Sequence, residues 1–185
     1  MSLRPVQIVL AAGLTAAVVA YGTIAFAAGT SPSTDAPGTG TAGKCATFKK
    51  DSAEWKKCMK AGRAAMNNED LYATGYQLAK AGDYADALEF LNAGTDKKDV
   101  RFLTMIGYST RKLGKIEEGM GYYMQALSLD PNSVTTREYL GEAYLQKKDL
   151  ASAQGQLVEI KNRCGISCES YTELNDQIGK YQSSL

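Results

Sequence analysis

Four cysteines are the residues of this chain whose type and spacing could carry redox or metal chemistry. Cys45 and Cys58 flank residues 46–57, and Cys164 and Cys168 flank residues 165–167. An even cysteine count in an exported chain, which the N-terminal segment described below indicates, is typical of two structural disulfides. The sequence allows three pairings, of which we favour the two local ones, Cys45–Cys58 and Cys164–Cys168.

Other cysteine chemistry fits the spacing less well. A four-cysteine zinc site needs short Cys-x-x-Cys knuckles, and the chain has none. A thiol–disulfide enzyme using Cys164 and Cys168 is an alternative, but such enzymes place Cys-x-x-Cys at a helix N-terminus. The chain also contains no histidine, which removes the commonest general base and mixed Cys/His zinc sites. We therefore predict a protein that is not an enzyme, with no metal and no cofactor.

The cysteine pairs flank a segment that repeats with a period of about 34 residues. Apolar and small residues of one copy recur 34 positions later, and a third copy lies 32 positions upstream. In each copy, apolar residues at i, i+3 and i+7 form one buried helical stripe. The glycine beside that stripe lets a second helix approach closely, and these glycines are Gly75, Gly107 and Gly141.

The sequence also predicts the turns between these helices. Gly82 and Gly114 follow the first helix of their copies, where a left-handed residue is common. Pro131 ends the second helix of the middle copy, and Asn132 or Ser133 can cap the next helix. The sequence therefore predicts an all-α fold built from helical hairpins.

The stretch from Gly107 to Asn132 resembles one full tetratricopeptide repeat (TPR), and the resemblance covers residues 68–167. It implies a TPR superhelix, an α-solenoid of three helix–turn–helix repeats at 68–99, 100–133 and 134–167. Residues 168–185 are expected to form a C-terminal capping helix that starts with a capping box at Ser170. The apolar stripe of that helix is Tyr171, Leu174, Ile178 and Tyr181.

Residues 45–67 are expected to form an N-terminal cap bounded by cysteines. Asp51 and Glu54 are candidate caps for a helix over residues 52–60, and Trp55 is expected to pack on the first repeat. The N-terminal cap, the repeats and the C-terminal helix together give about 140 residues, enough for one helical core.

The TPR resemblance implies a protein-binding groove lined by the first helix of each repeat. The matching positions of this chain are Tyr72, Tyr76, Lys80, Arg101, Tyr108, Arg111, Lys112, Glu138 and Glu142. Aromatic residues and arginine are enriched at binding hot spots, although these tyrosines can instead pack between repeats. The Lys/Asn carboxylate clamp of chaperone-binding repeats is absent. The groove is expected to be basic and aromatic at one end and acidic at the other, which favours a partner segment of opposite polarity.

The N-terminus indicates export. Arg4 is the only early charge, and an apolar run over residues 8–28 ends in Ala25-Phe26-Ala27. We predict a signal peptide over residues 1–27, with an uncleaved membrane anchor as the alternative, and a flexible linker over residues 28–44. Removal of residues 1–27 takes away Arg4 and leaves 20 basic and 20 acidic residues, which argues against nucleic-acid binding.

Three stretches narrow the resemblance to exported TPR proteins of alphaproteobacteria. They are residues 107–114, the Arg-Glu-Tyr-Leu-Gly-Glu motif at 137–142, and the cysteine-bounded region at 164–171. The resemblance implies export to the periplasm, where the chain would be free or tethered to the inner membrane through residues 8–28. The Pro-Lys-Gly turn expected after Cys45 in this family is missing.

These observations favour an exported TPR scaffold that binds another protein or a peptide segment through its concave groove. An assembly or maturation factor for an envelope complex would use the same groove and is the first alternative. The thiol–disulfide enzyme and a small-ligand binding protein follow. The sequence does not identify the partner.

Overall fold

The computed structural model describes residue 47 and residues 49–185. The signal peptide or anchor predicted at 1–27, the linker at 28–44 and Cys45 lie outside this range. The described residues form helices and no strand, as the repeat pattern predicts. Within the same range, no helix is both long and apolar enough to span a bilayer.

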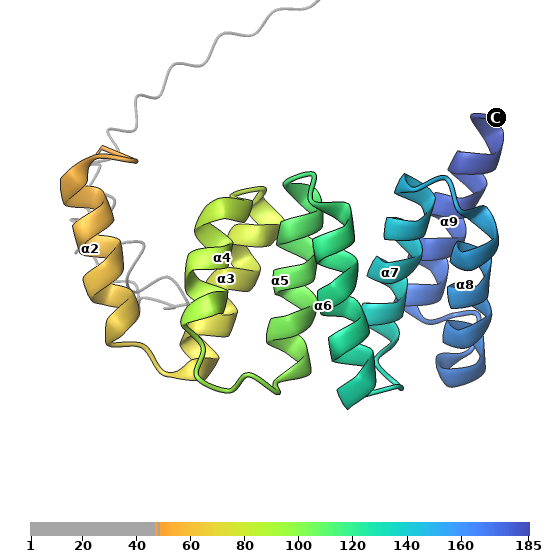
Figure 1. Ribbon diagram of the computed structural model, residues 1–185, viewed down its shortest axis with the longest axis horizontal. Helices are drawn as coiled ribbons and strands as arrows, with labels where there is room; N and C mark the ends of the chain where they lie inside the picture. The colour runs from red at the N-terminus through yellow and green to blue at the C-terminus, as the bar shows by residue number, and fades with distance from the viewer. Residues whose placement is uncertain (1–46, 48) are drawn as a thin grey trace, which may run out of the picture. The chain divides into compact units, whose positions relative to one another are not determined.

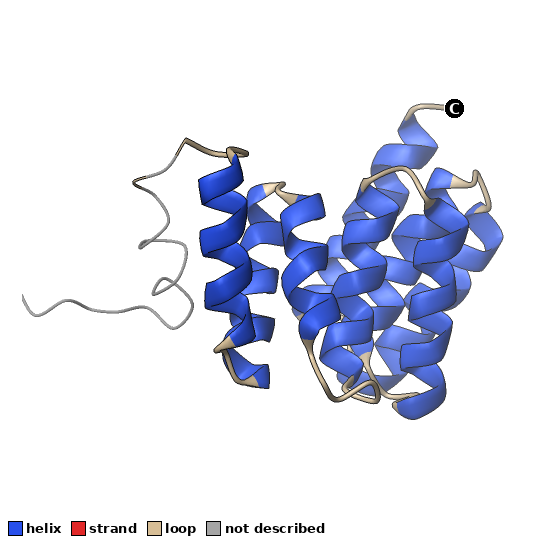
Figure 2. Cartoon of the chain, turned by 60° about the vertical axis from the view of Figure 1, so that its left-hand side comes forward, coloured by secondary structure: helices blue, strands red, loops and turns tan. Residues whose placement is uncertain are grey.

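Eight helices make up the described part of the chain (Figures 1 and 2). Their bounds are α2 Ala53–Ala64, α3 Asn68–Ala81, α4 Tyr84–Ala93, α5 Val100–Lys112, α6 Ile116–Leu129, α7 Val134–Gln146, α8 Leu150–Cys164 and α9 Glu169–Ser183. One helix pair lies within each range predicted for a repeat: α3 and α4, α5 and α6, then α7 and α8. Each helix from α3 onward contacts the next, and the first helices α3, α5 and α7 also contact one another in order.

The helix ends follow the signals in the sequence. Gly82 and Gly114 end α3 and α5 with φ of 90° and 88°, the left-handed region in which glycine avoids a steric cost. The third hairpin turns at Lys148, which adopts φ 62° without a glycine. Ser133 caps α7 by accepting a hydrogen bond from the backbone N–H of Thr136. The predicted turns are therefore confirmed.

Close helix approach explains two of the three repeat glycines as predicted. A Cβ on Gly75 would lie 2.6 Å from Leu91 of α4, and one on Gly107 would lie 2.6 Å from Tyr123 of α6. Gly141 differs, because the atoms nearest to its added Cβ belong to Leu174 of α9, at 2.5 Å. The third glycine thus makes room for the C-terminal helix and not for the second helix of its own repeat.

The start of α9 corrects the predicted capping box. The helix begins at Glu169 with Cys168 as N-cap, so Ser170 lies inside the first turn and is buried. The apolar stripe is as expected: Leu174 and Ile178 are buried, and two tyrosines, Tyr171 and Tyr181, pack beside them in the second core cluster. The predicted capping box at Ser170 is therefore wrong, whereas the predicted apolar stripe is confirmed.

The N-terminal helix α2 begins one residue later than expected and uses a different cap. The Ser52 hydroxyl accepts a hydrogen bond from the backbone N–H of Trp55 at 3.1 Å, so neither Asp51 nor Glu54 is the N-cap. Trp55 is partly buried and packs against the main core cluster together with Cys58, as predicted for the cap. The proposed Cys45–Cys58 bridge includes a residue outside the described range.

Candidate functional site: a groove across helices α3, α5, α7 and α9

A cavity of about 490 Å³ lies across α3, α5, α7 and α9. This volume is in the range of ligand pockets. Eight of the nine predicted groove residues line it: Tyr72, Tyr76, Lys80, Arg101, Tyr108, Lys112, Glu138 and Glu142. Beneath it, the hydroxyls of Thr104 on α5 and Thr136 on α7 form a buried 2.7 Å hydrogen bond that joins two repeats.

The α3 side of the groove is aromatic. The ring of Tyr72 lies 6.0 Å from that of Tyr76 and 5.5 Å from that of Phe102. The guanidinium of Arg101 lies 4.7 Å from the Tyr72 ring, and the ammonium of Lys80 lies 6.0 Å from the Tyr76 ring. Cation–π attraction therefore holds both cations over aromatic faces at the groove wall.

Tyr108 continues this aromatic wall into the middle of the groove. Its ring lies 4.9 Å from that of Tyr139 and 6.0 Å from that of Tyr84, and the Lys112 ammonium lies 5.5 Å from it. The three predicted tyrosines, Tyr72 among them, are half-buried and pack against the main core cluster. They therefore do both things that the sequence left open: they line the groove and they pack between repeats.

The basic residues of the groove differ in how far they are neutralised. Arg101 is paired within the fold to Glu69 at 3.0 Å and Asp99 at 2.9 Å, and hydrogen bonds to these carboxylates raise its pKa. Lys80 and Lys112 are exposed and form no ion pair with any described residue. These two ammonium groups keep their charge available to a ligand.

The α7 and α9 side is acidic. Glu138 is only 8% exposed, and burial raises its pKa to about 7, with carboxylate repulsion from Glu142, Glu173 and Glu169 adding to the effect. A hydrogen bond with Ser170 of α9 opposes the shift. Glu169 and Glu173 are exposed and have no ion-pair partner among residues 49–185. This side of the groove is therefore short of positive charge.

Arg111 is the predicted groove residue that does not line the cavity. Its guanidinium is buried, donates to the Tyr123 hydroxyl at 3.3 Å, and forms an ion pair with Glu142 of the next repeat. Burial opposes its charge, but Tyr123 and Glu142 raise its pKa overall. Arg111 thus joins α5, α6 and α7 from within, because it lies on the packed face of α5.

Sequence reasoning missed the contribution of α9, which brings Glu169, Ser170 and Glu173 to the cavity. The sequence does contain a signal for this role of α9. The apolar positions Leu103 and Ile106 recur two periods later as Tyr171 and Leu174. Helix α9 therefore occupies the place of the first helix of a fourth repeat, and its role as a cap does not exclude a role in the groove.

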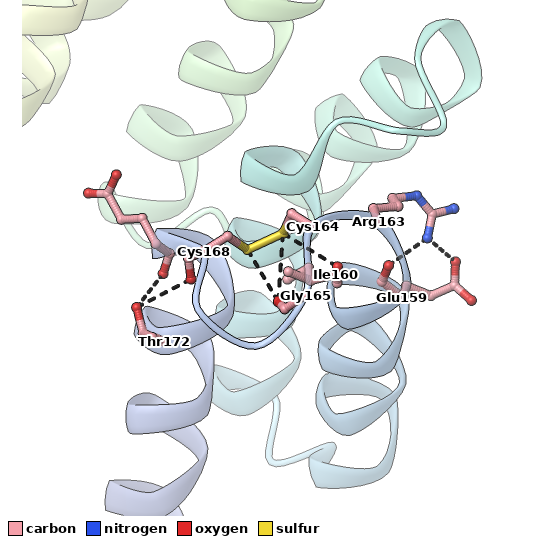
Figure 3. The surroundings of a disulfide bond; sticks show 8 residues. Glu159, Ile160, Arg163, Cys164, Gly165, Cys168 and Thr172 are labelled. Atoms are coloured by element: carbon pink, nitrogen blue, oxygen red, sulfur yellow. Dashed lines mark hydrogen bonds and ion pairs between the residues drawn. A yellow bond between two sulfur atoms is a disulfide. The ribbon is translucent and has the colours of Figure 1, made fainter.

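The disulfide Cys164–Cys168 links the end of α8 to the start of α9, as predicted (Figure 3). Gly165 lies in the loop with φ 82°, a value that a side chain would disfavour. On the α8 side, Arg163 pairs with Glu159 one turn earlier at 2.7 Å. The loop that the disulfide closes leads directly into Glu169, so the bridge restrains the end of α9 that reaches the groove.

No cluster of cysteine and carboxylate groups that could hold a metal ion occurs among the residues that the structure describes. The cavity lining combines aromatic rings, two ammonium groups that form no ion pair and several carboxylates. Such a surface suits noncovalent recognition.

Comparison with known proteins supports the repeat. Residues 100–133, which span α5 and α6, match the family model described as a tetratricopeptide repeat. A search of curated proteins gave no match.

Several solved structures share the fold. The type III secretion chaperone SycD of Yersinia enterocolitica, in complex with a peptide of the translocator YopD, is 22% identical with a TM-score of 0.53, over 63% of this chain and 89% of that one. PcrH, in complex with the chaperone binding region of PopD, is 24% identical with a TM-score of 0.52, over 63% and 88%. The first TPR domain of human RPAP3 is 17% identical with a TM-score of 0.54, over 62% and 91%. The chain thus has a TPR-like fold, with one repeat recognised from its sequence and an all-helical arrangement shared with these structures.

Proposed function

We propose that the protein is a TPR scaffold that binds a segment of another protein in the groove formed by α3, α5, α7 and α9. The observation that carries this proposal is the 490 Å³ cavity, in which residues from four helices converge. Its half-buried tyrosines offer rigid apolar surface, and its exposed lysines and glutamates offer specificity.

The structural neighbours support a peptide as the ligand. SycD was solved with a translocator peptide and PcrH with the chaperone binding regions of PopD and PopB. These proteins share the fold of this chain at low identity, so the comparison suggests the mode of binding and not the partner.

The compartment forms a second part of the proposal. The apolar N-terminal run predicts export, and a bridge between Cys164 and Cys168 would persist in an oxidising compartment such as the periplasm. In this reading the partner is an envelope or secreted protein, and the chain acts as a scaffold or as an assembly factor for it.

Site-specific photocrosslinking in the native host tests the groove. A photoreactive amino acid replaces Glu173, which lines the cavity, or Asp176, which is exposed on the same helix but outside it. We expect a discrete crosslinked protein from position 173 and none from position 176. Crosslinks of equal yield at both positions, or at position 176 alone, would place binding elsewhere on the chain.

A further inference from the structure

The charges of the groove are segregated. Lys80 and Lys112 stand at the C-terminal ends of α3 and α5, while the unpaired carboxylates of Glu169 and Glu173 stand in the first two turns of α9. Tyr72 and Tyr76 share α3 with Lys80, and Tyr108 and Tyr139 lie on the next two first helices, α5 and α7. A ligand that spans the cavity from α3 to α9 therefore meets unneutralised positive charge and aromatic rings on α3 and α5, then Tyr139 on α7, and unneutralised negative charge on α9.

We propose that the groove selects an extended peptide segment with two opposite charges: an acidic side chain that pairs with Lys80 and Lys112, and a Lys or Arg that pairs with Glu169 and Glu173. The proposal rests on the proposed function and specifies the partner chemistry for the same site. An apolar or aromatic residue between the two charges contacts the tyrosine wall. Unlike Arg101, which is already paired to Glu69 and Asp99, these four charged groups form no ion pair within the described fold.

The spacing of the two peptide charges follows from helix geometry. Packed helices lie about 8–10 Å apart, so the two steps from α5 to α9 cover roughly 16–20 Å. Lys112 ends α5 whereas Glu173 lies near the start of α9, which adds an axial offset of roughly 10 Å. The diagonal is about 20 Å, and an extended chain covers about 3.3 Å per residue. The acidic and basic residues are therefore expected about six positions apart.

Charge segregation also distinguishes this ligand from simpler ones. A uniformly acidic segment would meet repulsion at α9 from the two exposed glutamates, Glu169 and Glu173. A uniformly basic segment would meet Lys80 and Lys112. Like-charge contacts of this kind exclude wrong partners more strongly than the matching pairs add affinity.

The test starts from a displayed library of random dodecapeptides selected on the full chain under non-reducing conditions. Selected peptides are resynthesised with the acidic residue, the basic residue or both changed to the neutral amide. The wild type is then compared with two double variants at exposed positions, Lys80→Gln/Lys112→Gln and Glu169→Gln/Glu173→Gln. A matched control, Lys57→Gln/Lys161→Gln, removes two exposed lysines outside the cavity.

We expect each groove variant to weaken binding of the doubly charged peptide roughly three- to tenfold. The lysine variant should no longer distinguish the acidic peptide from its amide form, and the glutamate variant should no longer distinguish the basic one. Selected peptides that lack the charge pair, or that bind all variants equally while still crosslinking from position 173, would overturn this inference and leave the groove function intact. Failure to select any peptide would count against both.

Discussion

Glu138→Gln should change how the stability of the fold depends on pH. Burial in α7 and three neighbouring carboxylates raise the pKa of Glu138 from its ordinary 4.5 to about 7. The folded state therefore holds a proton between these two pH values that the unfolded state has lost. Stability falls as pH rises through this window, and the fall is complete above the folded pKa.

The size of the effect follows from the same two pKa values. Their difference corresponds to about 3 kcal/mol, because each pH unit contributes about 1.4 kcal/mol. Water in the open groove screens the carboxylate, so we expect about 2 kcal/mol. Glutamine resembles the protonated acid and does not ionise. The variant should exceed the wild type by less than about 1 kcal/mol at pH 5 and by about 2 kcal/mol at pH 8.

Urea unfolding at pH 5 and pH 8, followed by helical circular dichroism, measures this difference. Titrating groups that do not interact with Glu138 contribute equally to both proteins and cancel in the comparison. Asp176→Asn, an exposed change on α9, serves as the control and should leave the pH dependence of the wild type unaltered. If Glu138→Gln shows the same loss of stability between pH 5 and pH 8 as the wild type, the carboxyl of Glu138 ionises as in water, and the argument from burial is wrong.

Three further changes test the packing. Gly107→Ala places a methyl group 2.6 Å from Tyr123 and should lower the free energy of unfolding by about 2 kcal/mol, measured from urea midpoints. In the same assay Gly121→Ala, whose methyl group meets nothing within 4 Å, should be neutral or stabilising by up to about 1 kcal/mol. Arg111→Met should lower the free energy of unfolding by about 2 kcal/mol in the same assay, because the acceptors on α6 and α7 lose their buried donor. A decrease below about 0.5 kcal/mol would show that the ion pair of Arg111 is as weak as one on the surface. Changing Cys164 and Cys168 together to Ser should cost about 2 kcal/mol, as expected for a short closed loop, and wild type treated with a reductant should show the same loss.

Much of the fold could be predicted from the sequence because the repeat makes each signal appear more than once. The glycine turns at Gly82 and Gly114 and the cap at Ser133 are local, so the chain encodes them within a few residues. The N-terminal end of α9 could not be predicted in this way. The pattern at Ser170 has the residues of a capping box, but the helix already begins at Glu169, and it packs on α7 through contacts that are not local in sequence.

The same difference between local and non-local signals applies to the residues of the groove. The period predicts which positions of α3, α5 and α7 face the groove, and eight of the nine predicted residues line the cavity. Arg111 is the exception, because the period does not tell which way its long side chain turns once it is buried. Its charge is neutralised in the interior by Glu142, a residue that the sequence also assigned to the groove. This pairing leaves Glu142 less available to a ligand than Glu169 and Glu173, so the acidic side of the groove depends on α9.

The position of α9 therefore connects fold stability to recognition. Leu174 packs against Gly141, and Ile178 packs beside it. Burial of this face of α9 places the carboxylates in the first two turns of the helix at the groove. The bridge between Cys164 and Cys168 restrains the same end of the helix, and the buried residues Leu174 and Ile178 lie further along it. Reduction should accordingly lower stability without abolishing the groove. A change at Gly141, which displaces Leu174, should disturb both, because a Cβ there leaves no room for the helix that carries the acidic side of the site.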